Sequence, residues 1–385
     1  MLAPARRIAF DVLVRVHGGA WATELLVAAL EGLDARDAGL AQELVMGCLR
    51  RQAQLDFLIG HFAGRRDLKL DPEVSIALRL GIYQLYYLER IPPHAAVGES
   101  VELVKRANKA PAAGLVNAVL RKVRRGPVRW PDRATELSVP QWVLEGWERA
   151  YGRETAAKIA LAFLETPETW VRLGPGDRAP EGVRLEPAPD VPGAYRVVEG
   201  KPHGLRIQDV SSQSIVPLLD LQPGHTLLDL CAAPGNKTAQ AMESGAKAIA
   251  CDLYWRRLRD FQAAGAARVA LDARRPLPFR RRFDRVLVDA PCSGTGTLGR
   301  NPEIKWRLKP EDLDDLSNRQ TAILTRALEA LAPGGRLVYS TCSLEAEENG
   351  EVVRAVLGHA PEREFQRVPG LQAGDGFYAA VIPSR

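Results

Sequence analysis

The apolar residues in the first third of the chain recur every three or four positions. Two stretches show this spacing: Ile8, Val12, Leu13 and Val16, and the apolar residues between 76 and 87. The period places apolar side chains on one face of a helix, whereas a half-buried strand would alternate apolar and polar residues. Prolines interrupt the pattern at Asp71-Pro72, Ile91-Pro92-Pro93 and Ala110-Pro111. Residues 1–125 are therefore predicted to form an all-α bundle of about six short helices.

Prolines and short apolar runs characterise the next stretch. Gly126-Pro127, Trp130-Pro131 and Val139-Pro140 predict a linker over 126–140. Residues 142–164 return to helical spacing, but beyond Pro167 prolines separate short apolar runs. Such runs suit short strands better than a long helix. A small α+β middle domain is predicted over 141–204.

From residue 205 to the end, apolar strands alternate with helical stretches. The predicted strands are 226–231, 248–251, 268–271, 285–288 and 336–339, and the predicted helices are 238–243, 254–264, 313–331 and 345–357. This alternation predicts a doubly wound, Rossmann-like α/β domain with a mainly parallel sheet buried on both faces. Ligands of such sheets bind beyond the carboxyl ends of the strands. The predicted fold is thus multidomain, with an all-α, a small α+β and an α/β part.

Composition excludes several classes of protein. The 385 residues are 46% hydrophobic and 26% charged, so the chain can bury a core and is not disordered. Charges interrupt residues 1–16, and no apolar run is long enough to span a bilayer, so we expect a cytoplasmic protein without membrane contact. The five cysteines are an odd, scattered set and are predicted to be reduced. Neither they nor the six histidines have metal-ligand spacing, so no metal is expected.

Basic residues concentrate in the predicted helical bundle. Residues 1–130 hold 19 Lys and Arg against 13 Asp and Glu, a net charge of +6 in a chain whose total is +5. The clusters are Arg50-Arg51, Arg65-Arg66, Lys105-Arg106 with Lys109, and Arg121-Lys122 with Arg124-Arg125. Any one of them is equally compatible with a solvated helix face, but their sum favours a polyanionic partner.

A tight loop follows the first predicted strand of the sheet. Residues 229–238 read DLCAAPGNKT and open a helix. A phosphate-binding loop would need glycine directly before the lysine, where Asn236 stands, and a dinucleotide fingerprint would need more glycines than Gly235. The loop is therefore expected to bind something other than a phosphate chain.

Aspartates lie at the ends of the predicted strands. Asp252, which lies 17 residues beyond Gly235, can accept hydrogen bonds from both hydroxyls of a ribose, whereas so many carboxylates would repel a pyrophosphate. A nucleoside without phosphates is expected, and S-adenosylmethionine fits, with its adenine near Asp272 and its charged end near Asp229 and Asp289. An aspartate at any one of these positions is more often a capping or loop residue, but four in series favour a ligand site.

Two cysteines follow strands of the same predicted sheet. Cys342 lies between a strand end and a helix start, where amide dipoles favour a thiolate, whereas Cys48 and Cys251 are expected to be buried apolar residues. Thiolate attack on carbon 6 of a pyrimidine makes carbon 5 nucleophilic enough to accept a methyl group. A protonated Asp289 could supply the proton needed at N3 of cytosine, and Cys292 could assist release of the product.

Several motifs resemble the signatures of the RNA cytosine-5 methyltransferases. They are CAAPGNKT (231–238), DAPCSGTG (289–296), NPEIKW (301–306), TCSLEAEEN (341–349), RIQDVSSQ (206–213) and GDGF (374–377). The N-terminal stretch resembles a NusB-like RNA-binding domain in ELVMGCLR (43–50), GIYQLY (81–86), IPPHA (91–95) and VNAVLR (116–121). This fusion is similar to the bacterial 16S rRNA methyltransferase B, or Sun, subfamily.

The resemblance implies roles for named residues. Cys342 would be the nucleophile and Cys292 would aid product release. The cofactor S-adenosylmethionine would lie on Asp252, Asp272, Asp289 and the loop Cys231, Ala232, Ala233, Pro234, Gly235, Asn236 and Lys237. Asn236 departs from the family, which usually has a second glycine there, and asparagine tolerates a left-handed backbone better than most residues.

The expected partner is 16S rRNA, naked or in assembly intermediates, because a target base must leave its stack to reach a thiolate. The protein is expected to be a monomer. Arg300, Lys305 and Trp306, in the long loop after Cys292, could contact the base or its backbone. The alternatives are a methyltransferase that acts on tRNA or 23S rRNA, and a non-catalytic RNA-binding or assembly protein.

Overall fold

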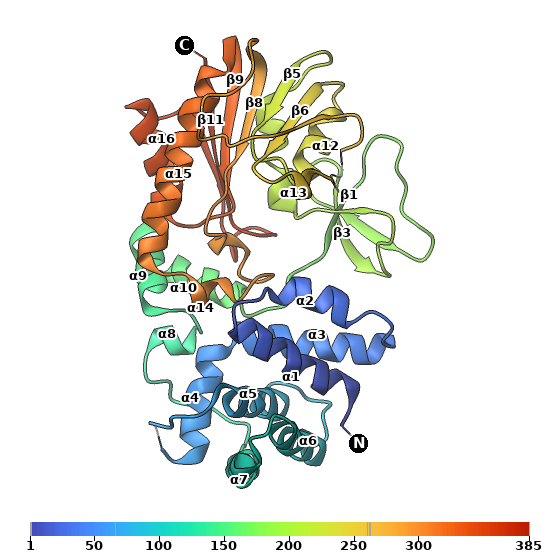
Figure 1. Ribbon diagram of the computed structural model, residues 1–385, viewed down its shortest axis with the longest axis vertical. Helices are drawn as coiled ribbons and strands as arrows, with labels where there is room; N and C mark the ends of the chain where they lie inside the picture. The colour runs from blue at the N-terminus through green and yellow to red at the C-terminus, as the bar shows by residue number, and fades with distance from the viewer. Residues whose placement is uncertain (1, 66, 260, 262, 385) are drawn as a thin grey trace. The chain divides into compact units, whose positions relative to one another are not determined.

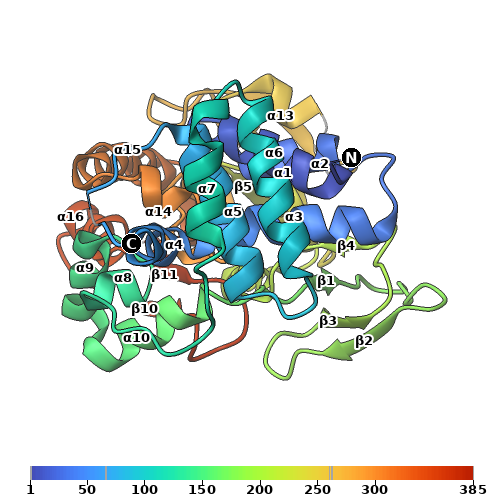
Figure 2. The ribbon, with the colours of Figure 1, turned by 90° about the horizontal axis from the view of Figure 1, so that it is seen from below.

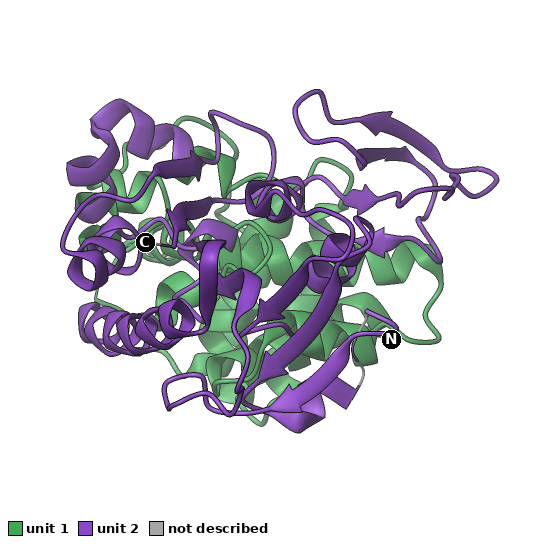
Figure 3. Cartoon of the chain, turned by 90° about the horizontal axis from the view of Figure 1, so that it is seen from above, with its two compact units in different colours: residues 1–145, 160–166, 298–307 green, residues 146–159, 167–297, 308–385 purple. Residues whose placement is uncertain are grey.

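The computed structural model describes residues 2–65, 67–259, 261 and 263–384, and the chain forms two compact units (Figure 3). The helical unit comprises Met1–Glu145, Ala160–Thr166 and Leu298–Arg307. The sheet unit comprises Gly146–Ile159, Pro167–Thr297 and Leu308–Arg385. Each unit is described by itself below.

The helical unit is built from short helices around one apolar core. They are α1 (Pro4–His17), α2 (Ala22–Ala29), α3 (Ala35–Arg50), α4 (Gln52–Ala63), α5 (Pro72–Tyr86), α6 (Pro93–Arg106), the 3-10 turn η1 (Ala110–Ala112), α7 (Ala113–Leu120), α8 (Arg133–Glu136) and α14 (Ile304–Arg307). α9 (Gln141–Tyr151) and α10 (Arg153–Ala162) contribute residues to both units. Helices α1, α3, α5 and α6 lie side by side in Figure 2, and α5 packs on α1, α3, α6 and α7. The expected all-α bundle is thus confirmed.

Sequence signals explain where the helices begin. The Asp34 carboxylate accepts hydrogen bonds from the amides of Arg36 and Asp37, both at 2.9 Å, and so satisfies the first turn of α3. Helix α5 begins at Pro72, which needs no amide partner in the first turn. Buried apolar side chains from α1, α3, α4, α5, α6 and α7 then form one continuous core.

The segment Leu298–Arg307 is fastened to this bundle although it follows Cys292 in sequence. Arg50 donates from Nε and Nη2 to the carbonyl of Gly299, at 3.0 and 2.9 Å, and Glu303 accepts from the amide of Ala22 at 2.7 Å. Ala22 is the first residue of α2, so the Glu303 carboxylate caps that helix. Arg50 is only 5% exposed, so the expectation that it contacts phosphate is wrong. Arg66, in another expected cluster, lies outside the described residues.

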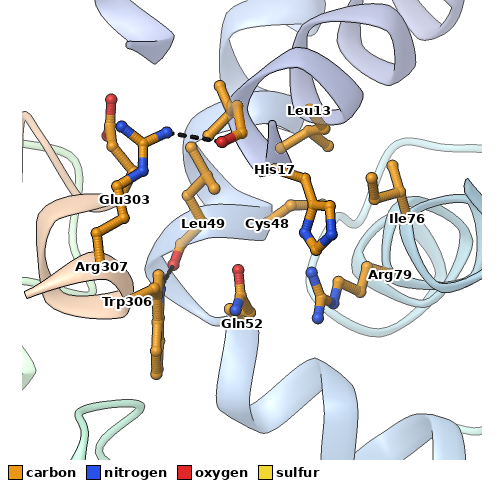
Figure 4. Close-up of a pocket in the computed structure, with 11 residues that line it drawn as sticks. Leu13, His17, Cys48, Leu49, Gln52, Ile76, Arg79, Glu303, Trp306 and Arg307 are labelled. Carbon is orange, nitrogen blue, oxygen red and sulfur yellow. Dashed lines mark hydrogen bonds between the residues drawn. The ribbon is translucent and has the colours of Figure 1, made fainter. Parts of the chain in front are cut away.

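Three side chains of the same segment cap helix carboxyl ends, and Figure 4 shows two of them, Trp306 and Arg307. Lys305 Nζ donates to the carbonyl of Arg50 at 2.9 Å, and Trp306 Nε1 donates to that of Leu49 at 2.8 Å. Arg307 donates to the carbonyls of Val16 and Ala20, at 2.7 and 2.5 Å. The last carbonyls of a helix lack partners within it, so these donors satisfy the ends of α1 and α3. A cavity of about 280 Å³ remains beside Leu49, Trp306 and Arg307.

The buried position of Lys305 excludes one expectation. The side chain is 1% exposed, so Lys305 cannot reach RNA from the surface as the sequence suggested, and the indole nitrogen of Trp306 is engaged within the unit. Burial lowers the pKa of Lys305 to about 7, and the charges of Arg50 and Arg51 contribute further. This lysine is an anchor of the segment.

The sheet unit contains two sheets. The small antiparallel sheet has the order β2-β3-β1-β4, and the large sheet has the order β10-β11-β9-β8-β5-β6-β7 (Figure 1). The strands are β1 (Trp170–Arg172), β2 (Arg184–Pro187), β3 (Ala194–Glu199), β4 (Arg206–Ile207), β5 (Thr226–Asp229), β6 (Lys247–Asp252), β7 (Ala267–Ala270), β8 (Phe283–Asp289), β9 (Leu331–Thr341), β10 (Arg363–Arg367) and β11 (Phe377–Pro383). β5 to β9 pair in parallel, whereas β11 is antiparallel to both β9 and β10.

Helices cover both faces of the large sheet. The helical elements of this part are α11 (Val210–Gln213), η2 (Val216–Leu219), α12 (Asn236–Met242), α13 (Trp255–Arg259), η3 (Thr295–Thr297), α15 (Pro310–Glu329), η4 (Ala346–Glu348) and α16 (Gly350–Leu357). Side chains from α15 and α16 join one apolar cluster with Val286 and Val288, and side chains from η2 and α12 join another with Leu287. Alternate residues of one strand therefore enter opposite cores.

The predicted fold class is confirmed, with differences in detail. The five predicted parallel strands are present, but the two antiparallel strands β10 and β11 were not predicted. The helix predicted over 254–264 is observed over Trp255–Arg259, and its residues 260 and 262 lie outside the described residues. The helix predicted over 345–357 is divided at Asn349 into η4 and α16. No helix among the described residues has the length and apolar character required to cross a membrane.

We predict that Gly47→Ala destabilises the helical unit. A Cβ atom at this position of α3 would lie 2.0 Å from Cζ of Tyr83, whose hydroxyl is held by Glu43 at 2.5 Å. Overpacking of this kind costs about 1–3 kcal/mol. Gly39→Ala on the same helix is the matched control, because nothing lies within 4 Å of its Cβ, and it should stabilise α3 by up to about 1 kcal/mol. Urea unfolding compares the two, and equal stabilities would contradict the packing described.

We also predict that Lys305→Met changes the pH dependence of stability. Because the folded-state pKa of about 7 lies below the ordinary value of 10.5, the unfolded chain binds more protons above pH 7. Stability of the wild type should therefore rise with pH, by on the order of 1–2 kcal/mol between pH 7 and pH 9 relative to the variant. Urea unfolding at both pH values measures this, with Lys122→Met, at an exposed position, as control. A constant difference between wild type and Lys305→Met would show that the ammonium is not desolvated.

Candidate active site

The carboxyl ends of the parallel strands bring the expected acidic residues to one edge of the large sheet. Asp229 is the last residue of β5, Asp252 of β6 and Asp289 of β8. Asp272 follows the end of β7 by two residues. Because β5, β6, β7 and β8 run in parallel, their carboxyl ends meet at the same edge.

Asp229 presents a buried acceptor without a partner. Its side chain is 1% exposed, and Oδ2 accepts from Thr238 Oγ1 at 2.6 Å. Oδ1 accepts no hydrogen bond among the described residues. Burial raises the pKa of Asp229 to about 7, and the nearby charge of Asp289 adds to this effect. An unsatisfied buried oxygen is costly unless a ligand completes it, so this atom suits the amino group of a cationic ligand.

The loop after β5 is shaped by Gly235 and not by Asn236. Gly235 has a φ of 109° and caps the start of α12, whereas Asn236 is already the first residue of the helix. Its side-chain amide donates to the carbonyl of Ile207 at 3.2 Å. Asparagine at 236 therefore needs no left-handed backbone, and the departure from glycine causes no strain there.

Lys237 and Asp289 form an ion pair at the sheet edge. Lys237 Nζ lies 2.7 Å from Asp289 Oδ2, and Ser340 Oγ donates to Oδ1 at 2.9 Å. The lysine side chain is 10% exposed, and its Nζ lies 4.9 Å from the centre of the Phe377 ring. The pair therefore places an ammonium group beside a carboxylate that also accepts from Ser340 on β9, the strand that leads to Cys342.

The other two aspartates are engaged by arginines. Asp252 is 2% exposed, and its Oδ2 accepts from Arg257 at 3.0 Å. Asp272 accepts from Nε and Nη2 of Arg274, both at 2.8 Å, and this contact lowers the pKa of Asp272 to about 2. The two arginine side chains are about half exposed, and the hydrogen bonds they donate leave lone pairs on both carboxylates for further donors.

The two expected cysteines are in contact. Cys292 Sγ and Cys342 Sγ are 3.3 Å apart, both thiols are free, and both residues are partly exposed. The amide of Gly296 donates to the carbonyl of Cys342 at 2.9 Å. A Cβ at 296 would lie 2.2 Å from the carbonyl of Gly376, so only glycine allows this close approach. The structure thus brings the DAPC, TCS and GDGF motifs together.

The remaining cysteines fit the passive roles expected of them. Cys48 and Cys251 are buried, and burial raises the pKa of Cys251 to about 12. Burial also raises the pKa of Cys231, in the loop after β5, well above its ordinary value. A protonated thiol at these positions is a weak nucleophile. Among the described residues, no group of three His, Cys, Asp or Glu side chains is arranged to hold a metal ion.

Sequence reasoning missed two groups at this edge. The contact of Lys237 with Asp289 was missed because Lys237 was assigned to the cofactor loop, and only the fold shows that its Nζ reaches Asp289. Glu348, inside the TCSLEAEEN motif, received no role, although it is completely buried and contacts the residue after each cysteine. The motif holds three glutamates, so the sequence alone does not single out Glu348.

The chain matches two family models. One, described as 16S rRNA methyltransferase RsmB/F, matches residues 216–384, and the other, described as the NusB family, matches residues 3–125. The probable ribosomal RNA small subunit methyltransferase B of Bacillus subtilis is 34% identical and covers 93% of this chain and 89% of its own length. The ribosomal RNA small subunit methyltransferase B of Cronobacter sakazakii is 33% identical over 90% of each chain.

Solved structures show the same fold. The crystal structure of PH0851 has a TM-score of 0.81 at 20% identity and covers 99% of this chain and 98% of its own. A methyltransferase homolog protein from Pyrococcus horikoshii has a TM-score of 0.58 at 24% identity and covers 67% of this chain and 100% of its own.

The identity to the Bacillus and Cronobacter proteins extends over most of both chains, and the expected resemblance to the methyltransferase B, or Sun, subfamily is confirmed. The orphaned oxygen of Asp229 fits the cationic cofactor that was expected. The chain is therefore an S-adenosylmethionine-dependent methyltransferase that belongs to the RsmB/F family and carries an N-terminal NusB-family domain.

Proposed function

We propose that the enzyme methylates carbon 5 of a cytosine in 16S rRNA through a covalent adduct between Cys342 and carbon 6. The observation that carries the proposal is the contact of two free thiols, 3.3 Å apart, between loops that follow β8 and β9. A methyltransferase that acts on an exocyclic nitrogen or a ribose hydroxyl needs no thiol. Two thiols at the cofactor edge therefore favour a carbon atom as the acceptor.

S-adenosylmethionine, when bound, supplies an electrophilic methyl group. We assign its amino group to Oδ1 of Asp229, its ribose to Asp252 and its adenine to the neighbourhood of Asp272. The loop from Cys231 to Lys237 would form the wall of this site, since it joins β5 to α12. Oδ2 of Asp252 accepts one hydrogen bond from Arg257 and keeps a lone pair for a ribose hydroxyl.

The chemical step begins at Cys342. Its thiolate forms a bond to carbon 6 of cytosine, the electron pair of the C5–C6 double bond forms a C4–C5 double bond, and the electron pair of the C4–N3 double bond moves to N3, which takes a proton. The Lys237–Asp289 pair supplies that proton, because Lys237 Nζ already donates to Asp289 Oδ2 at 2.7 Å. This assignment gives Asp289 its expected role without requiring it to be protonated beforehand. Carbon 5, now enamine-like, accepts the methyl group.

Release reverses the addition. A base, water in the simplest case, removes the proton from carbon 5, the C5–C6 double bond forms again, and the S–C6 bond breaks. The proton on N3 returns to the Lys237–Asp289 pair, so the net reaction frees the single proton taken from carbon 5. Cys292 would assist by donating its S–H hydrogen bond to the departing sulfur of Cys342, at 3.3 Å.

The small-subunit rRNA is proposed as the substrate because the relatives that cover most of the chain are named for it. The basic excess of residues 1–130 supports a polyanionic partner, but some of these cations serve the fold. Arg124 and Arg125 donate to backbone carbonyls, and Lys109 pairs with Asp71 at 2.8 Å. The target base must leave its stack, so naked RNA or an assembly intermediate remains the proposed form, with the enzyme acting as a monomer.

We predict that alanine blocks different steps of the reaction at the two cysteines. Cys342→Ala should abolish methyl transfer from labelled S-adenosylmethionine to naked 16S rRNA, because no adduct can form. Cys292→Ala should still form the adduct but release it slowly, so that a protein–RNA complex stable to denaturant accumulates on gels. Mapping of the modified base checks the position, with 23S rRNA and tRNA as competing substrates. Full activity of Cys342→Ala, or a methyl group elsewhere than carbon 5, would contradict the mechanism.

We predict that Asp252→Asn weakens cofactor binding. The amide keeps the size of the side chain but accepts through one oxygen, so one ribose hydroxyl loses its partner, at a cost of about 1–2 kcal/mol or roughly tenfold in Kd. Titration calorimetry with S-adenosylmethionine measures this directly. Asp315→Asn, an exposed residue on α15, is the control. Equal affinity of Asp252→Asn and the wild type for S-adenosylmethionine would contradict the assignment of Asp252 to the cofactor site.

A further inference from the structure

A fully buried carboxylate joins the two cysteine loops. Glu348, the last residue of η4, is 0% exposed. Its Oε1 accepts from the amide of Ser293 at 2.8 Å and from Gln320 Nε2 at 2.9 Å. Its Oε2 accepts from Ser343 Oγ at 2.5 Å and from Ser293 Oγ. All four partners are neutral groups, and two of them are N–H groups that can only donate.

The partners of Glu348 follow the two thiols directly in sequence. Ser293 comes after Cys292, and Ser343 comes after Cys342. The two serine hydroxyls are themselves 3.1 Å apart, close to the 3.3 Å between the sulfur atoms. One carboxylate therefore fixes the spacing of both loops, and a satisfied buried network of this kind is rigid.

Helix α15 and strand β9 also donate hydrogen bonds to Glu348. Gln320 Nε2, on α15, donates to the carbonyl of Pro291 at 2.9 Å as well as to Glu348. Tyr339 on β9 donates its hydroxyl to the backbone carbonyl of Glu348 at 2.7 Å. The carboxylate is thus held by elements on both sides of the two loops and cannot turn away from Cys292.

The carboxylate of Glu348 accepts two hydrogen bonds from Ser293, which follows Cys292, but only one from Ser343, which follows Cys342. The hydrogen bond with Cys342 and burial raise the pKa of the Cys292 thiol well above its ordinary value, and the charges of Cys342 and Glu348 add to that effect. The other titratable groups around this cluster are Tyr339, Tyr378, Cys231, Glu345 and Glu347. None of them is a cation that would offset the charge of Glu348 beside Cys292.

We propose that Glu348 is the positioning residue that holds Cys292 and Cys342 in contact and keeps the proton of the pair on Cys292. The inference rests on the proposed function in one respect, namely that Cys342 is the nucleophile. Glu348 touches neither substrate nor cofactor in this role. It acts through the two serines and through its charge.

Thiol labelling of the full chain tests the proposal without RNA or cofactor. Iodoacetamide is added between pH 6 and pH 10, and peptide mass spectrometry gives the labelling rate of each cysteine. In the wild type Cys342 should react at least tenfold faster than Cys292 at neutral pH. Glu348→Gln should reduce this ratio at least fivefold, because the charge beside Cys292 is lost. Glu347→Gln, the same change one residue earlier, should leave the ratio within twofold of the wild type.

A second variant separates the effect of the hydrogen bonds to Glu348 from the effect of its charge. Ser343→Ala removes one donor to Oε2 but leaves the carboxylate in place, so kcat for rRNA should fall at least tenfold while KM and the labelling ratio stay within threefold. Wild-type kcat in Ser343→Ala would overturn the positioning role. Ser343→Ala also tests the positioning role if circular dichroism shows that Glu348→Gln does not fold.

A folded Glu348→Gln protein with an unchanged labelling ratio would overturn the electrostatic role, even if its thermal stability fell. A merely structural residue would give that result. By contrast, a wild-type enzyme that left cytosine carbon 5 unmodified would contradict the proposed function. The labelling ratios need neither RNA nor cofactor, so they would still test the role of Glu348.

Discussion

The structure depends most on the contact between two sulfur atoms from separate loops. β8 and β9 are neighbouring parallel strands, so the loops that leave their carboxyl ends emerge side by side. The amide of Gly296 and the carboxylate of Glu348 then bring these loops together until Cys292 and Cys342 touch at 3.3 Å. In the proposed mechanism the addition needs only Cys342, whereas assisted release needs both sulfur atoms at this distance.

The carboxylates at the carboxyl ends of β5 and β8 differ in burial and in hydrogen-bond partners. Asp229 is nearly inaccessible and keeps one oxygen unsatisfied, which favours a ligand that brings its own positive charge. Asp289 is satisfied instead by Lys237 and Ser340, so it stays paired until a base enters. Two carboxylates at the ends of β5 and β8 thus differ in role because their partners differ. The sequence alone shows only that both are aspartates.

Much of the fold follows from local sequence patterns. The period of apolar residues identified the helical bundle, and the short apolar runs at β5 to β9 identified the parallel sheet, because both depend on neighbours along the chain. β10 and β11 were not predicted, and β10 reads REFQR, which lacks the apolar run of a buried strand. The motifs placed Cys292, Cys342 and the cofactor loop, since residues at strand ends share an edge.

Long-range contacts limited what could be predicted. Nothing near Lys305 in sequence indicates that its ammonium caps α3, because its partner lies 255 residues away. The arginines on Asp252 and Asp272 are near in sequence, but their pairing depends on loop geometry. The contacts of Glu348 could not be predicted either, because its partners come from three separate segments.

The central claim is that Cys342 bonds to carbon 6 of the target cytosine. An RNA that carries 5-fluorocytidine tests it most directly, because fluorine replaces the proton that must leave carbon 5 and so blocks release. Peptide mapping of the enzyme trapped on this RNA in the presence of S-adenosylmethionine should find the nucleotide attached to Cys342. Attachment to Cys292, or no attachment under conditions where ordinary RNA is methylated, would contradict the account.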